Sequence, residues 1–203
     1  VAANDLDGDK AAAARATENL NTRIAGKALT LFGREGTDRY GRVVAQVALK
    51  DAGWLQAALI SDGSLRVAPE ASEISCAEPL LGLEAKARAA GKGLWHEAAF
   101  GVEQAGDIES LTQALGRFAV VEGVIARVGE TKSRTYLDFG RRYSRDFSIM
   151  IPRSARAGFA AAGIDLKRLR GRHIRVRGVL FSSGGPAIEI RKPASLEILG
   201  DGT

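Results

Sequence analysis

The sequence predicts an α+β chain, mostly β, that consists of two small domains in series. Its 203 residues suffice for two such domains. Apolar residues recur at helical spacing in parts of the first half, whereas they alternate with other residues in the second half. The charge is divided too: residues 1–103 carry 12 Lys and Arg against 14 Asp and Glu, a net of −2, and residues 104–203 carry 17 against 10, a net of +7. Periodicity and charge therefore change together, as expected at a domain boundary.

The composition excludes several classes of protein. Hydrophobic residues make up 45% and charged residues 26%, which is usual for a globular chain, and no run of eighteen apolar residues could span a bilayer. Cys76 is the only cysteine, which excludes an internal disulfide and a cysteine-based zinc site. With only His96 and His173 besides, no metal site is predicted. Cys76 is interpreted as a small buried residue rather than a reactive thiol. Because the sequence begins at Val1, a removed leader and a longer natural chain both remain open.

Each element of the first half is predicted from its apolar spacing and its end signals. Asp9 is the expected N-cap of the first helix, and Gly26 follows its end. Gly63 and Gly91 mark the ends of the two later helices. A glycine-rich turn separates the two strands. The predicted segments are a helix at 9–24, strands at 27–32 and 42–49, and helices at 54–61 and 78–90.

The second half predicts five strands with one helical insertion. The domain boundary is expected within residues 97–107, which have no clear periodicity. The helical insertion, roughly 153–169, falls between the third and fourth strands, and that order is typical of the OB barrel. The sequence therefore predicts a basic five-stranded OB-fold domain over residues 107–200. Its strands are expected near 118–124, 135–139, 147–151, 174–180 and 188–190.

Three segments of the first half resemble the staphylococcal nuclease (thermonuclease) family. Thr37-Asp38-Arg39-Tyr40-Gly41-Arg42 looks like its D-K-Y-G-R segment, Leu55–Gly63 like its next helix, and Leu83–Trp95 like its last helix. Order and spacing agree over residues 1–97. The resemblance implies a nuclease-like OB barrel with helices, incomplete at its N-terminus because the family's first three strands have no counterpart here. The second half resembles, more loosely, small OB modules attached to nuclease-like domains in bacteria, through 135–140 and 185–190.

The resemblance also implies a catalytic site, and this sequence departs from it. Arg42 matches the family's second catalytic arginine, which stabilises charge on the phosphate. Asp5 stands where the general-base glutamate belongs, one methylene short, and Ala2 replaces a calcium ligand. We therefore expect phosphodiesterase activity to be degenerate or absent. If active, the chain would be a calcium-dependent nuclease (a phosphodiester hydrolase), with Ca²⁺ bound only if the natural chain completes the site. By family analogy it would be exported to the periplasm or outside the cell.

The predicted OB barrel offers a candidate nucleic-acid-binding face. OB barrels bind through strands two and three and through the loops between strands one and two and strands four and five. Arg175 and Arg177 are expected to face outward, opposite the apolar residues of the fourth strand. The candidate binding residues are Lys132 and Arg134 in the first loop, Tyr136 and Tyr143 for base stacking, and Arg141, Arg142 and Arg145 for phosphate contacts.

The sequence is compatible with two functional hypotheses. The first is a nucleic-acid-binding protein of the thermonuclease-like family, whose basic residues contact phosphates. The second is a non-catalytic accessory or scaffold subunit of a larger protein assembly, because OB barrels also dock proteins. In the second reading the basic surface serves only solubility.

Overall fold

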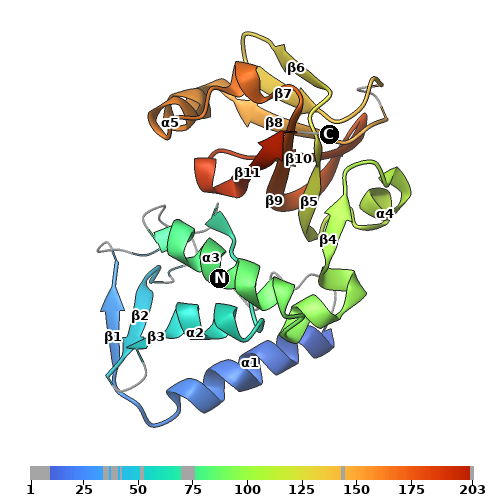
Figure 1. Cartoon of the computed structure of the whole chain (residues 1–203). Coiled ribbons are helices and arrows are strands. Elements are labelled where there is room, and N and C mark those ends of the chain that lie inside the picture. The colour runs from blue at the N-terminus through green and yellow to red at the C-terminus, as the bar shows by residue number, and fades with distance from the viewer. Residues whose placement is uncertain are drawn as a thin grey trace. The chain divides into compact units, whose positions relative to one another are not determined.

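A computed structural model of the chain describes residues 10–33, 37, 41, 43–50, 53–69, 76–142 and 145–201. It has a mixed α+β fold (Figure 1). The chain divides into two compact units, one of Val1–Val67 with Ala71–Phe100 and one of Ala68–Glu70 with Gly101–Thr203. No helix in the described part is long and apolar enough to cross a membrane.

The first unit combines helices with a small antiparallel sheet. Its three strands lie in the order β1-β2-β3, with Leu29 of β1 opposite Leu49 of β2. Its core contains Leu55, Leu59 and Ile60, which lie on the inner side of the second helix. The elements are α1 (Lys10–Ile24), β1 (Leu29–Phe32), β2 (Gln46–Leu49), β3 (Gly53–Trp54), α2 (Leu55–Ser61), α3 (Ala77–Ala89) and the 3-10 turns η4 (Gly93–His96) and η5 (Ala98–Phe100).

Glycines end the helices of this unit, as predicted. Gly26, Gly63 and Gly91 have φ angles of 66°, 75° and 58°, in the left-handed region that glycine adopts without strain. Gly63 also lies against Gly93. Its carbonyl accepts a 2.9 Å hydrogen bond from the Leu94 amide, and a Cβ on Gly63 would lie 2.1 Å from the Lys92 carbonyl oxygen. The end of α2 and the segment after α3 therefore meet backbone to backbone.

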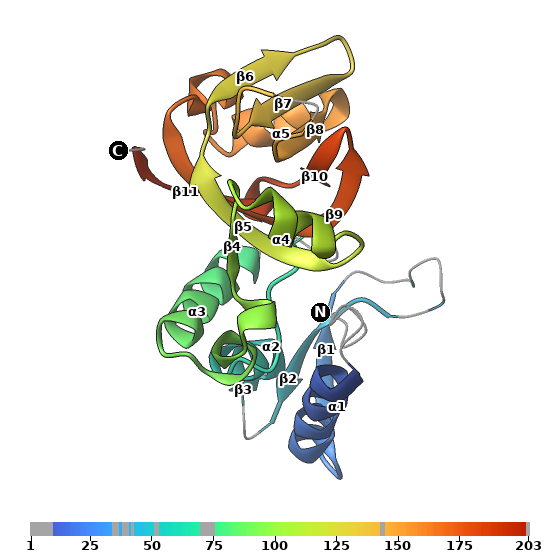
Figure 2. The same cartoon turned by 90° about the vertical axis from the view of Figure 1, so that its right-hand side faces the viewer.

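The second unit is dominated by strands. Figures 1 and 2 show α5, the α-helix between β8 and β9, next to β7 and β8. The elements are β4 (Val102–Gln104), α4 (Ile108–Gln113), β5 (Phe118–Val124), β6 (Arg127–Glu130), β7 (Arg134–Asp138), β8 (Ser148–Pro152), η6 (Arg153–Ala155), α5 (Arg156–Ala161), η7 (Leu166–Leu169), β9 (Arg172–Ser183), β10 (Gly185–Glu189), η8 (Pro193–Ser195) and β11 (Leu196–Asp201).

The strand order of this unit is OB-fold-like. The sheet runs β4-β5-β9-β10-β8-β7-β6, and β11 pairs with β9 beside this path. Figure 2 shows the chain passing from β5 into β6 as one curved segment. Taking β5 and β6 as one bent strand, the helical segment falls between the third and fourth strands, as in an OB fold. β8 and β10 pair in parallel, and the other pairs between β5 and β10 are antiparallel.

Side chains alternate between the two faces of the strands, and the apolar face lies in the core of this unit. Leu137, Ile149, Ile151, Leu180 and Ile188 are all fully buried and belong to one core cluster. Because successive side chains of a strand point to opposite faces, the even-numbered residues of β7 and β8 lie on the outer face.

Three sequence predictions for this unit are wrong in detail. The helix expected at 153–169 is instead η6, α5 and η7, because Gly163 with a φ of 75° ends the helical path after α5. Three short strands, β4, β6 and β11, were not predicted. Arg175 and Arg177, expected to face outward, are 13% and 1% exposed at their side chains. They form ion pairs with Glu122 of β5 and Glu197 of β11, the strands on either side of β9.

Candidate nucleic-acid interface

An open groove of about 520 Å³ lies on the outer face of the strands β6, β7 and β8. Tyr136 and Asp138 of β7 and Ser148 and Met150 of β8 line it from the floor. Ser183, at the end of β9, contributes to its rim. These are the strands and the loop that OB folds use for ligands. The groove is therefore the candidate binding site of this unit.

Tyr136 lies in the middle of the groove floor. Strand pairing places it between Gly129 of β6 and Met150 of β8. A Cβ on Gly129 would meet nothing within 4 Å, so no side chain crowds the tyrosine from that strand. The Tyr136 side chain is half-buried. A flat ring with one open flank is the kind of surface on which a nucleobase stacks.

A polar cluster forms one end of the floor. Arg127 donates from Nε and Nη2 to Asp138 Oδ2, at 3.0 and 2.8 Å, and Ser148 Oγ donates to Asp138 Oδ1 at 2.9 Å. Asp138 is 2% exposed, whereas the Arg127 side chain is 60% exposed. The buried carboxylate thus fixes the orientation of an exposed guanidinium at the groove.

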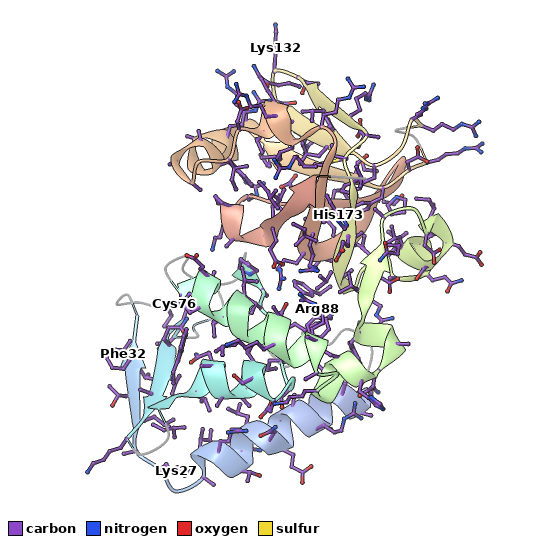
Figure 3. All side chains as sticks on the ribbon, viewed as in Figure 1. Lys27, Phe32, Cys76, Arg88, Lys132 and His173 are labelled. Carbon is purple, nitrogen blue, oxygen red and sulfur yellow. The ribbon has the colours of Figure 1, made fainter. Side chains whose placement is uncertain are left out.

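Two of the predicted basic residues lie at the opposite end, near the β6–β7 loop. Lys132 is exposed and extends away from the sheet (Figure 3). Arg134 lies on the same face of β7 as Tyr136, and its Nη2 is 3.5 Å from Glu189 Oε2. Its side chain remains 46% exposed. Both cations can therefore approach a phosphate chain that follows the groove.

The other predicted arginines belong to the β7–β8 loop, which follows Asp138 at the polar end. Arg141, Arg142 and Arg145 are exposed. Asp146 accepts a 2.7 Å hydrogen bond from the Arg142 amide. A Cβ on Gly185 would lie 2.6 Å from the carbonyl oxygen of Arg145, so this loop rests directly on the start of β10. The loop arginines thus follow one end of β7, whereas Lys132 and Arg134 lie at its other end, and the lining of the groove includes none of them. Tyr143 lies outside the described residues.

Sequence reasoning missed part of the groove. Arg127 and Gly129 were missed because β6 has only four residues, of which one is glycine and two are charged, so it shows no clear apolar alternation. Asp138 and Ser148 were visible as polar residues inside apolar strands, between Leu137 and Phe139 and between Phe147 and Ile149. A polar pair at opposed positions of neighbouring strands is a usable signal for a shared hydrogen bond.

The predicted catalytic residues of the first unit, Asp5 and Arg42, lie outside the described residues, as does Ala2. Among the residues that the structure does describe, no three His, Cys, Asp or Glu side chains gather closely enough to hold a metal ion.

Parts of the chain are similar to solved structures. They include an OBody, AM1L10, bound to hen egg-white lysozyme (18% identity, TM-score 0.32, 44% of this chain and 85% of that chain). A second is asparaginyl-tRNA synthetase from Pyrococcus horikoshii complexed with asparaginyl-adenylate (13% identity, TM-score 0.32, 46% of this chain and 21% of that chain). A third is aspartyl-tRNA synthetase from Entamoeba histolytica (8% identity, TM-score 0.35, 52% of this chain and 23% of that chain). This chain spans less than a quarter of either synthetase.

No curated protein matches the sequence. A protein-family model does, and its description is staphylococcal nuclease homologue. The match extends over residues 8–97, which include all helices and strands of the first unit up to η4. Residues 8–97 are therefore a staphylococcal-nuclease-like domain, and an OB-fold-like unit follows it.

Proposed function

We propose that this protein binds nucleic acid in the groove across β6, β7 and β8, with phosphodiesterase activity that is degenerate or absent. The observation that supports the proposal best is Tyr136 on the floor of an open groove whose lining includes the exposed Arg127, with further exposed cations in and beside the loops before and after β7. Aromatic side chains stack on bases, and Lys and Arg contact phosphates, so this combination suits a single strand. The net charge of +7 over residues 104–203 adds a long-range attraction for a polyanion.

Replacing Tyr136 with alanine is expected to weaken binding of a single-stranded oligonucleotide about tenfold, because a base–aromatic stack contributes about 1–3 kcal/mol. Fluorescence anisotropy with labelled DNA and RNA of roughly 12 nucleotides, within the usual site size of OB folds, measures this. Binding should also weaken steeply with salt, with a log–log slope of about −0.7 for each phosphate contacted.

Two variants serve as controls for that experiment. Tyr136→Phe keeps the ring and should retain most of the affinity. Arg168→Ala removes a cation whose side chain is 88% exposed and which does not line the groove, and it should leave binding nearly unchanged. If Tyr136→Ala binds like the unaltered protein, or if Arg168→Ala loses as much, the groove is not the binding face.

We propose that the nuclease-like domain binds nucleic acid or supports the second unit, and that it does not cleave phosphodiester bonds. The basis is the sequence: Ala2 stands at a calcium-ligand position and Asp5 at the position of the general base. We expect labelled single-stranded DNA and RNA to remain intact with the full chain, both with calcium and with a chelator, when analysed on a denaturing gel. Shortening that requires calcium and disappears in Arg42→Ala would contradict this part of the proposal.

An accessory or scaffold role is the second candidate, and one observation favours it. Leu29, Leu31 and Phe32 of the edge strand β1 are 42%, 54% and 58% exposed. Apolar side chains gathered on an edge strand favour contact with another protein. A protein complex that survives salt sufficient to abolish oligonucleotide binding would support this role over the first.

A further inference from the structure

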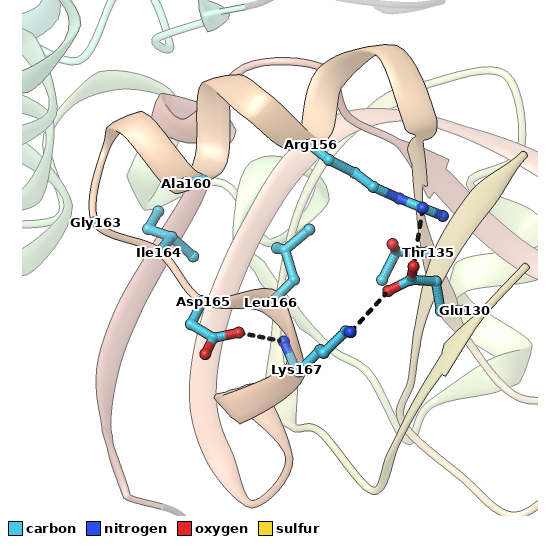
Figure 4. Close-up of a pocket in the computed structure, with 9 residues that line it drawn as sticks. All are labelled: Glu130, Thr135, Arg156, Ala160, Gly163, Ile164, Asp165, Leu166 and Lys167. Carbon is cyan, nitrogen blue, oxygen red and sulfur yellow. Dashed lines mark hydrogen bonds and ion pairs between the residues drawn. The ribbon is translucent and has the colours of Figure 1, made fainter. Parts of the chain in front are cut away.

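A second cavity, of about 460 Å³, lies at α5 and shares only Glu130 with the lining of the groove. Figure 4 shows its two kinds of wall. Ala160, Ile164 and Leu166, from α5 and the segment after it, form an apolar wall. Glu130 and Thr135, from the β6–β7 hairpin, face this wall together with the long side chains of Arg156 and Lys167. The volume is within the usual range for sites that hold small molecules.

Two buried polar atoms behind the polar wall have no hydrogen-bond partner in the described part of the chain. They are Thr135 Oγ1 and Arg156 Nε. Thr135 is 1% exposed. Arg156 uses its other nitrogens, with Nη1 donating to Glu130 at 3.0 Å and Nη2 to the Thr131 carbonyl at 2.8 Å. Buried polar groups are seldom left unpaired, so each is an observation that points to a ligand.

Lys167 is the most available cation of the cavity. Its Nζ lies 3.9 Å from Glu130 Oε2, beyond hydrogen-bond distance, and its side chain is 76% exposed. Both oxygens of Glu130 already face cations, Arg156 at one and Lys167 at the other. Within the described part of the chain, the groups of this cavity that lack a close partner are therefore Arg156 Nε, Lys167 Nζ and the Thr135 hydroxyl. Donors require an acceptor, and the cationic ones favour an anionic acceptor.

We propose that this cavity binds a small organic acid, a carboxylate carried by an apolar body. The apolar body would pack on Ile164, Leu166 and Ala160. The carboxylate would accept from Lys167 Nζ, and a small rotation of Thr135 would bring its hydroxyl into the same site. The proposal is independent of nucleic-acid binding in the groove.

Benzoate is the probe, because it joins a carboxylate to a flat apolar ring. Titrating it into ¹⁵N-labelled full-length protein should shift the amide resonances of residues 163–167 and of Thr135, with a dissociation constant of about 1 mM, as expected for so small a ligand. Benzamide has the same shape without the charge and should bind about tenfold more weakly. Equal binding of the two compounds, or no shift at these amides, would overturn the proposal.

Two further variants separate the cavity from non-specific binding. Lys167→Met should weaken benzoate binding about tenfold, whereas Arg168→Met removes a charge from the neighbouring position, outside the lining, and should change it less than twofold. Ile164→Trp should fill the cavity and abolish the shifts while the remaining spectrum stays that of a folded protein. Undiminished binding in Ile164→Trp, or equal losses in the two cation variants, would show that benzoate binds elsewhere.

Discussion

Gly63→Ala is expected to destabilise the first unit by about 3 kcal/mol, because two costs add at this position. With its φ of 75°, an alanine would sit in the left-handed region, which costs about 1–2 kcal/mol. The new Cβ would also lie 2.1 Å from the Lys92 carbonyl oxygen, and a backbone group cannot turn aside as a flexible side chain does. Relief of that overlap should cost about 1–3 kcal/mol more. Urea unfolding followed by tryptophan fluorescence measures the loss.

The fluorescence signal is specific because both tryptophans, Trp54 and Trp95, belong to the first unit. Gly91→Ala is the matched control. Gly91 also has a positive φ, 58°, but a Cβ there would meet nothing within 4 Å, so only the conformational cost of about 1–2 kcal/mol should appear. Equal losses in the two variants would mean that the contact between Gly63 and the segment after α3 does not matter for stability.

Glu197→Ala should destabilise the second unit by about 3 kcal/mol. Glu197 accepts a hydrogen bond from Arg177, whose side chain is 1% exposed, and lies 3.5 Å from Arg175. Removing one partner of a buried ion pair takes away compensation from the other buried charge and typically costs about 3–5 kcal/mol. The lower end applies because Glu197 is 22% exposed. Far-UV circular dichroism during urea unfolding should show the shift, while the tryptophan transition of the first unit stays in place.

Glu189→Ala provides the comparison within the same unit. Glu189 pairs with Arg134 and Arg191, whose side chains are 46% and 60% exposed, so its loss should cost less than about 1 kcal/mol. A similar loss in Glu189→Ala and Glu197→Ala would refute the view that burial of Arg177 sets the larger effect.

The sequence predicted the elements whose signals are local. α1, α2 and α3 were found from apolar spacing and from glycines beyond their ends, and β5, β7, β8, β9 and β10 from alternation. The helix at 153–169 was overextended, since spacing alone could not show that Gly163 adopts a positive φ. The burial of Arg175 and Arg177 depends on Glu122 and Glu197, which lie on other strands. Such partners are set by the sheet topology and cannot be read from one strand.

In the candidate groove, too, local features could be predicted from the sequence, whereas contacts between strands could not. The sequence named Tyr136 as a residue for base stacking and placed Arg134 in the loop before it, and strand pairing then puts Tyr136 beside Gly129 and Met150. The orientation of Arg127 by Asp138 could not be predicted, because it requires the register between β6 and β7. The sequence therefore predicts which residue types line a binding face, whereas the register between strands determines which of them become neighbours.

The pairing of β9 with β5 has a consequence for how the second unit folds. Glu122 and Arg175, which this pairing brings together, are 53 positions apart in the chain, whereas β6, β7 and β8 are joined by short loops. Closing the longer loop costs more chain entropy before any contact compensates for it. During synthesis β5 leaves the ribosome well before β9. Until β9 is available, the backbone hydrogen-bonding groups along that edge of β5 stay unpaired. Folding of this unit should therefore be slow and complete only after β9 and β11 have been synthesised, and until then mistaken strand pairing with other chains is the main competing process.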